Sequence, residues 1–295
     1  MADYILSCES TVDLSPEHLR ARNLEYIRYP FQINGKDYLD DLGQTLPYEE
    51  MYRMMSEGAE THTAQINIAS YQDYWRPFLQ QGKDVVHVVL SSGLTGGISS
   101  ARNAAAILRE EFPERLVYVV DSLAASSGFG LLMDRAADLR DEGYSAEELV
   151  TWIKENRRKL NHWVFSTDLG FYVRGGRISK AAAVFGGALK ICPMLYMDKA
   201  GHLVPREKIR TKKRVISEIE KRMEMYAENG TDYSGKCYIS HSDDYEDARQ
   251  VADLVEAAFP KLNGKVEINW IGSTVGSHSG PGTVALYFWG KERNE

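Results

Sequence analysis

The sequence of 295 residues has few cysteines, no surplus of positive charge and no long apolar segment. Its three cysteines lie far apart and form no CxxC pair, which argues against a disulfide framework. Lys and Arg together number 35 against 42 Asp and Glu, and the resulting net charge of −7 argues against a surface that wraps nucleic acid. We therefore expect a protein of the reducing cytoplasm that has no nucleic-acid partner.

The sequence also lacks a membrane-spanning segment. No run of about eighteen apolar residues is present, which is roughly the length that a transmembrane helix needs. The first residues do not show the basic and apolar regions of a secretory signal. The acidic balance gives no electrostatic attraction to anionic lipids. We expect a cytoplasmic location without stable membrane insertion.

The common motifs for cofactors and for hydrolytic catalysis are missing as well. Neither GxxxxGK[ST] nor GxGxxG occurs, so the usual cradles for a nucleotide are absent. The histidines form no HExxH pair, and the GxSxG elbow of the α/β-hydrolases is not found. We therefore expect neither a cofactor nor a metal.

The first half of the chain alternates patterns of buried strands and helices. Residues 85–90 and 116–120 are apolar, β-branched runs, and helical patterns follow them at 98–110 and 124–141. Strands and helices in this order form a βαβ unit, which requires a parallel sheet with a right-handed crossover. The first half therefore predicts an α/β domain.

The second half has short strands around two longer helical patterns. Strands are expected at 163–165, 195–197, 203–204, 238–240, 266–271 and 284–289, and helices at 211–226 and 245–259. A chain of this length corresponds to about two domains. We expect an α/β fold with an N-terminal α/β domain at residues 1–160 and a C-terminal α+β domain at 161–295.

A loop rich in hydroxyls and glycine follows the expected strand at 85–90. Ser92, Thr95 and Gly96 belong to the stretch Ser-Ser-Gly-Leu-Thr-Gly-Gly at 91–97, which leads into a helix. The carboxyl edge of a parallel sheet is where open α/β folds bind ligands, and free helix N–H groups attract anions. The loop predicts a carboxylate or phosphate site, with a capped turn as an equal alternative.

Two other segments carry candidate residues. Arg174, Arg177 and Lys180 surround two glycines and suit either a phosphate or an acidic partner, unless they only offset nearby acids. The small, apolar stretch at 181–189 suits the wall of a passage for a long ligand, although core packing explains it equally well. His278 lies in a segment of glycines and hydroxyls at 272–283, where a buried structural histidine is the alternative to a site residue.

Five motifs in order along the chain resemble those of the DegV family, which includes the fatty-acid-binding subunits of bacterial fatty acid kinase. They are the opening strand and turn at 7–14, Thr-Ala-Gln at 63–65, the loop at 91–97, Arg-Gly-Gly-Arg-Ile at 174–178 and His-Ser-Gly-Pro-Gly at 278–282. Ala64 stands where the family pattern has Ser, and Thr95 and Gly97 stand where it has Ser and Thr. These exchanges change the number of hydroxyls near the expected site.

The resemblance implies a non-catalytic carrier in which one long-chain fatty acid lies in an apolar tunnel between two α/β domains. By position, Thr63 and Ser92 would hold the carboxylate, in the same region as Thr95 and Gly96. His278 would lie beside the carboxylate, and Arg210, or its neighbour Arg206, would join the polar network. A partner kinase with a dihydroxyacetone-kinase-like domain would phosphorylate the carboxylate with ATP, and the acyl phosphate would enter phospholipid synthesis.

Two other functions are compatible with the residue types. A serine-type hydrolase would use Ser92 with His278 and an acid such as Asp121, although the missing elbow counts against it. A lipid-sensing regulatory module would use the basic segment at 174–180 to dock on a partner, which is also compatible with the carrier function.

Overall fold

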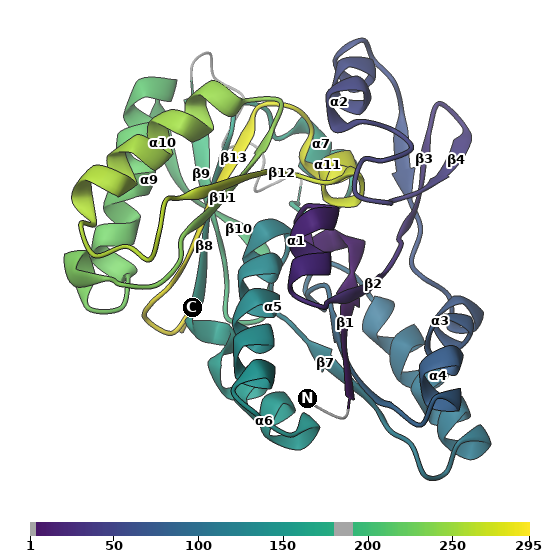
Figure 1. Cartoon of the computed structure of the whole chain (residues 1–295). Helices are drawn as coiled ribbons and strands as arrows, with labels where there is room; N and C mark the ends of the chain where they lie inside the picture. The colour runs from purple at the N-terminus through teal and green to yellow at the C-terminus, as the bar shows by residue number, and fades with distance from the viewer. Residues whose placement is uncertain (1–3, 180–190) are drawn as a thin grey trace.

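The computed structural model describes residues 4–179 and 191–295 and contains three sheets in that part of the chain (Figure 1). The first is a four-stranded parallel sheet with the order β2 (Glu25–Ile27), β1 (Tyr4–Glu9), β6 (Asp84–Val89) and β7 (Val117–Asp121). The strands expected at 85–90 and 116–120 are thus confirmed as neighbours. Strand β6 is a buried β-branched run because helices cover both faces of the sheet, whereas the first three residues of the edge strand β7 are half-buried.

Four helices flank this parallel sheet. Helices α3 (Ile68–Gln80) and α4 (Gly97–Glu111) pack against each other and against the sheet on one side, and α5 (Ser126–Asp141) and α6 (Ala146–Asn156) lie on the other side (Figure 1). Ser145 begins α6 with a capping box, since its hydroxyl accepts from the Glu148 N–H and the Glu148 carboxylate accepts from the Ser145 N–H.

The second sheet is mixed and has six strands. Its order is β10 (Leu203–Arg210), β9 (Ile191–Met197), β8 (Leu160–Ser166), β13 (Thr283–Trp289), β11 (Tyr238–Ser242) and β12 (Glu267–Trp270). All pairs are antiparallel except β11 with β12. Helices α9 (Lys212–Tyr226) and α10 (Tyr245–Ala258) cover one face. Helix α5 packs on the opposite face, so it is buried between the two large sheets along almost its whole length.

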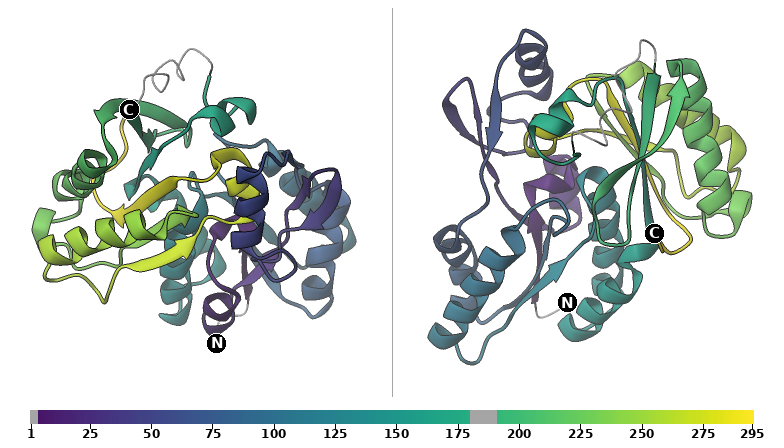
Figure 2. Two further views of the ribbon diagram at one scale, coloured as in Figure 1. Left: turned by 90° about the horizontal axis from the view of Figure 1, so that it is seen from above. Right: turned by 180° about the vertical axis from the view of Figure 1, so that it is seen from behind.

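A small antiparallel sheet extends from the rest of the molecule (Figures 1 and 2). It has the order β4 (Lys36–Leu39), β3 (Pro30–Ile33) and β5 (Thr61–Thr63), with α2 (Tyr48–Ser56) beside it. Asn34 and Gly35 form the β3–β4 turn with φ of 50° and 75°, as a two-residue primed turn requires. Strand β5 contacts α11 (Ser273–Ser279), which joins this small sheet to the C-terminal half.

The strand and helix assignments differ from the sequence-based expectations in a few places. The segment at 272–283, expected as a connection between strands, contains the short helix α11, and α7 (Gly170–Arg174) ends at the first residue of the basic segment. The last strand of the parallel sheet ends at Asp121 and the mixed sheet begins at Leu160. A division into domains at residue 160 remains a prediction. Lys180 and the proposed tunnel wall at 181–189 lie outside the described residues.

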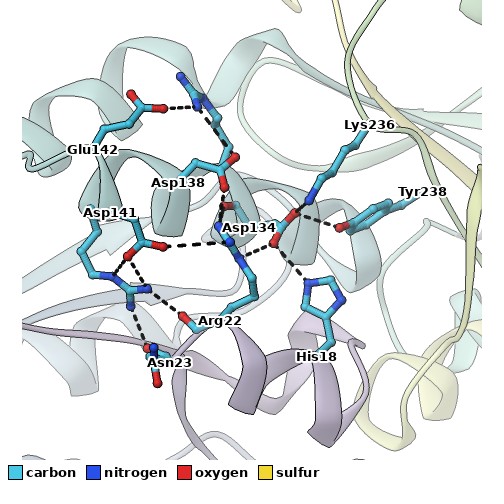
Figure 3. A network of polar contacts seen from close by, with 11 residues as sticks. His18, Arg22, Asn23, Asp134, Asp138, Asp141, Glu142, Lys236 and Tyr238 are labelled. Carbon is cyan, nitrogen blue, oxygen red and sulfur yellow. Dashed lines mark hydrogen bonds and ion pairs between the residues drawn. The ribbon is translucent and has the colours of Figure 1, made fainter. Parts of the chain in front are cut away.

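An ionic network centred on Asp134 ties α5 to α1 (Pro16–Ala21) and to the start of β11 (Figure 3). The Asp134 side chain is 1% exposed and contacts His18 and Arg22 at 3.2 and 2.9 Å. Lys236 also pairs with it, and the Tyr238 hydroxyl donates to it at 3.0 Å. These groups together hold the pKa of the Asp134 carboxyl well below its ordinary value against the opposing effect of burial. The network thus links helices α1 and α5 to the mixed sheet.

Within the described ranges, no helix is long and apolar enough to cross a membrane.

Candidate functional site

A cavity with about 1090 Å³ of empty space, including its open mouth, lies between the two large sheets. One wall comes from the carboxyl edge of the parallel sheet, where Tyr29, Leu90 and Ala125 follow β2, β6 and β7. The opposite wall is formed by side chains of the mixed sheet: Val164, Met197, Leu203, Ala285 and Tyr287. The cavity thus occupies the edge at which open α/β folds bind ligands.

The polar end of the cavity carries a chain of hydrogen bonds from three separate segments. The Thr63 hydroxyl of β5 lies 2.7 Å from Nε2 of His278, and Nδ1 of the same ring lies 3.1 Å from the Arg177 guanidinium. Arg177 is further anchored by a 2.6 Å bond to the Gly175 carbonyl. All three side chains line the cavity. The structure therefore brings together residues 63, 177 and 278, which are far apart in the sequence.

The direction of this chain follows from the chemistry of its members. A guanidinium only donates, so Nδ1 of His278 accepts and the ring proton resides on Nε2, which donates to Thr63. Burial, with a smaller contribution from Arg177, lowers the pKa of His278 to about 4, so the ring is neutral near pH 7. Because the Thr63 oxygen accepts from the ring, its own hydrogen is available to a ligand. The arrangement suits an anionic group in the cavity.

The loop after β6 supplies another hydroxyl to the same cavity. Thr95 lines the cavity and its hydroxyl accepts from the N–H of Gly97, the first residue of α4, at 3.3 Å. Gly96 at the N-cap offers no side chain to the helix end. The loop is fixed by Ser91, whose buried hydroxyl donates to the Gly201 carbonyl at 2.8 Å. A Cβ at Gly93 would lie 2.4 Å from the Gly201 carbonyl carbon, so this approach requires glycine.

Two lining hydroxyls make no hydrogen bond to any described residue. They belong to Tyr29 and Ser279, whose side chains are buried. Gln65 also lines the cavity, with its amide against Gly96. Sequence reasoning did not single out Tyr29 because it stands in no recognised motif. The only sequence signal is its place just after a short strand, at the edge where the other candidate loops gather.

Five of the expected site residues, with Arg206 counted as the alternative to Arg210, lie outside the cavity lining. Ser92 is exposed and outside the cavity lining, and the same holds for Gly96, which only borders the lining through Gln65. Arg210 is exposed at the end of β10, and Arg206 pairs with Glu295 at the surface. Arg174 is exposed, with its guanidinium 4.2 Å from the centre of the Phe171 ring. A carboxylate-binding role for Ser92 or Arg210 stays a prediction that the cavity geometry does not favour.

The geometry also bears on a serine-type hydrolase. Asp121 accepts hydrogen bonds from the backbone N–H groups of Ser92 and Leu123 at 3.1 and 3.0 Å, so it supports the loop and does not orient a histidine. His278 directs its Nε2 proton at Thr63 and cannot take a proton there. No cluster of three His, Cys, Asp or Glu side chains suited to a metal occurs among residues 4–179 and 191–295.

Comparison with known proteins places the chain among close relatives over its whole length. A family model with the description "Uncharacterised protein, DegV family" matches residues 6–291. A DegV domain-containing protein of Clostridium perfringens is 31% identical over 98% of both chains. The DegV domain-containing protein YteA of Lactococcus lactis is 31% identical over 97% of this chain and 98% of its own length.

Solved structures share the fold. A DegV family protein from Thermus thermophilus, described with fatty acid binding, is 27% identical with a TM-score of 0.86, over 98% of this chain and 100% of the other. A DegV family protein from Eubacterium eligens, loaded with heptadecanoic acid, is 21% identical with a TM-score of 0.84, over 97% and 99%. The arrangement of a parallel sheet followed by a mixed sheet is the one seen in those structures. The chain described here therefore belongs to the DegV family.

Proposed function

We propose that this chain binds one long-chain fatty acid in the cavity between its two large sheets, with the carboxylate at Thr63, Thr95, His278 and Arg177. The observation that carries the proposal is the Arg177–His278–Thr63 chain, which leaves the Thr63 hydroxyl free to donate into the cavity. A buried carboxylate needs several donors, or it becomes protonated. The fatty acid binding described for the Thermus thermophilus relative supports the same ligand.

The remaining walls suit an acyl chain. Leucine, valine, alanine, isoleucine and methionine make up much of these walls, together with the rings of His162, Tyr172 and Tyr287. A C16 chain buries about 14 methylenes, worth roughly 11 kcal/mol at about 0.8 kcal/mol each, before the cost of ordering the chain. Affinity would therefore come from the acyl chain, and selection for an acid from the polar end.

We further infer that the chain is a carrier and does no chemistry itself. Ala64 and Gln65 line the cavity near Thr63 and are exposed, so the polar end opens to solvent. An open polar end allows a partner to reach the carboxylate. That partner would be a fatty acid kinase with a dihydroxyacetone-kinase-like domain, which forms an acyl phosphate with ATP for phospholipid synthesis. A hydrolase is the weaker hypothesis, because Nδ1 of His278 accepts from Arg177, so that Nε2 carries the ring proton and donates it to Thr63.

Arg174 offers a test of the partner. It is an exposed cation beside the polar end, whereas Arg177 is occupied with His278. With purified kinase, ATP and Mg²⁺, we expect Arg174→Glu to slow acyl phosphate formation roughly tenfold, since charges at an interface rim act mainly on association. Hydroxylamine trapping measures the product. Palmitate affinity should stay unchanged.

Lys154→Glu reverses the charge of another exposed residue, on α6, and serves as the matched control. An equal slowing in this control, or a loss of palmitate binding in Arg174→Glu, would contradict the docking role. Absence of acyl phosphate with the unaltered, palmitate-loaded chain would contradict the carrier function.

A further inference from the structure

Tyr29 has a fixed position on the cavity wall. It follows β2, its N–H donates to the Ser10 hydroxyl at 3.1 Å, and its carbonyl accepts from the Asp40 N–H at 2.8 Å. Its backbone N–H and its carbonyl are thus both hydrogen-bonded to other segments. The residue is 3% exposed, and its side chain lines the cavity.

The phenol hydroxyl of Tyr29 meets no hydrogen-bond partner in good geometry among the described residues, although the Thr95 hydroxyl is near enough to act on its pKa as a hydrogen-bond donor. A buried hydroxyl without a partner costs free energy, so such groups in a native protein generally have a ligand or water to bind. The other tyrosines of the cavity differ. Tyr172 lies 3.1 Å from the Thr283 hydroxyl, and Tyr287 lies 2.7 Å from the Ser240 hydroxyl.

The hydroxyl of Tyr29 lies at the N-terminus of α4, next to the Thr95 loop. A Cβ built on Gly97 would be 3.2 Å from this hydroxyl and 3.7 Å from the Thr95 hydroxyl, so the two oxygens flank the same backbone. Helix α4 has 15 residues and a glycine at its N-cap, and the only side chain that accepts from its first turn in the described structure is Thr95, at the Gly97 N–H. An anion at this point would meet the helix end as well as the phenol.

We infer that Tyr29 is an additional ligand-binding residue, which donates its phenol hydrogen to the carboxylate of the bound fatty acid. This inference rests on the proposed function and extends it to the choice of head group. Ala64 lines the same cavity without a hydroxyl, and Tyr29 lies close to it, since the Ala64 N–H donates to the carbonyl of Pro30, the residue after Tyr29. A carboxylate accepts this hydrogen bond more strongly than an alcohol or an ester does.

The protonation state agrees with a donor role. Burial, reinforced by the negative charge of Glu9, raises the pKa of Tyr29 well above its ordinary value, although Thr95 and Arg177 act in the opposite direction. The phenol therefore keeps its hydrogen near neutral pH.

The test compares Tyr29→Phe with Tyr172→Phe, a matched control whose hydroxyl already has a partner in the protein. Each delipidated variant is titrated calorimetrically with palmitate and with hexadecanol. We expect Tyr29→Phe to weaken palmitate binding roughly 10- to 100-fold, as expected for a hydrogen bond to a charged group, with hexadecanol binding nearly unchanged. Tyr172→Phe should change the affinity for palmitate and the affinity for hexadecanol by the same factor.

A second readout uses palmitate labelled with ¹³C at the carboxyl. The ¹³C chemical shift of the bound carboxylate should change in Tyr29→Phe and stay the same in Tyr172→Phe. Unchanged palmitate affinity and an unchanged signal in Tyr29→Phe would overturn the role of Tyr29 while leaving fatty acid binding intact. Failure of the unaltered chain to take up palmitate would overturn the proposed function itself.

Discussion

Buried ionisable side chains surround the cavity, and each has a protonation state set by its surroundings. His278 is neutral because its ring is buried and faces a guanidinium. Glu9, at the end of β1, lies behind the cavity wall and accepts from the Tyr71 hydroxyl at 2.5 Å and from the Leu90 N–H at 2.7 Å. Burial raises the pKa of Glu9 to about 7, despite these two hydrogen bonds.

From the raised pKa of Glu9 we expect the free energy of unfolding to depend on pH. Its folded pKa lies above the ordinary value of 4.5. The free energy of unfolding therefore has its full contribution from protonated Glu9 below about pH 4.5, and that contribution is lost as pH rises through about 7. Glu9→Gln should gain roughly 3 kcal/mol relative to the unaltered chain between those limits. Urea unfolding at a series of pH values measures the difference. Glu110→Gln, at an exposed site on α4, is the control, and a difference that does not vary with pH would contradict the assignment.

Sequence reasoning identified the residues of the polar end only in part. Thr63, Thr95 and His278 were expected near a ligand and line the cavity. Ser91 and Ser92 are neighbours in one motif, yet only the structure shows that Ser91 is buried and Ser92 exposed. Both residues lie beyond the end of β6, where a turn begins, and the sequence alone does not show which of two adjacent side chains in a turn faces the interior. Arg177 was expected to bind a phosphate or an acidic partner, which stays a prediction, and its contact with His278, 101 positions along the chain, was not foreseen.

At the scale of the elements, the strands of the parallel sheet were predictable because buried β-branched runs are distinctive. Helix α11 was not, because Ser273, Gly276 and Ser277 are poor helix formers. Its packing against α7 and β5 supplies what propensity does not. This short helix carries His278, so the element that sequence patterns missed is the one that positions the site.

The Asp134 network predicts a second pH effect on stability. Asp134 and Glu267 raise the pKa of His18 to about 9, against the opposing effect of burial. The charged His18 ring makes its full contribution to the free energy of unfolding below pH 6.5, and this contribution is lost as pH rises through about 9. His18→Gln should cost roughly 1–3 kcal/mol at pH 6, allowing for partial solvent screening, and much less at pH 10.

Thermal or urea unfolding at both pH values checks this prediction. His62→Gln, at an exposed site in β5, is the control for loss of a histidine. A cost for His18→Gln that is the same at pH 6 and pH 10 would show that the ring does not act through its charge.

At the scale of the whole molecule, the cavity depends on how the two large sheets meet. Leu90 and Ala125 come from the ends of parallel strands, whereas Val164 and Ala285 come from the mixed sheet. Helix α5 lies between the sheets and the Asp134 network connects it to both sides (Figure 3). The order of motifs predicted two α/β halves, but sequence patterns contain no information on the angle at which two sheets pack.

The central claim is that this cavity holds one fatty acid by its carboxylate, and native mass spectrometry of the delipidated chain with palmitate tests it most directly. The account predicts a saturable adduct of one palmitate per chain. Thr63→Val, which removes the terminal donor, should weaken the adduct roughly tenfold, whereas Ser92→Ala, outside the cavity lining, should bind like the unaltered chain. No saturable adduct, or an adduct equally strong in Thr63→Val, would contradict the account.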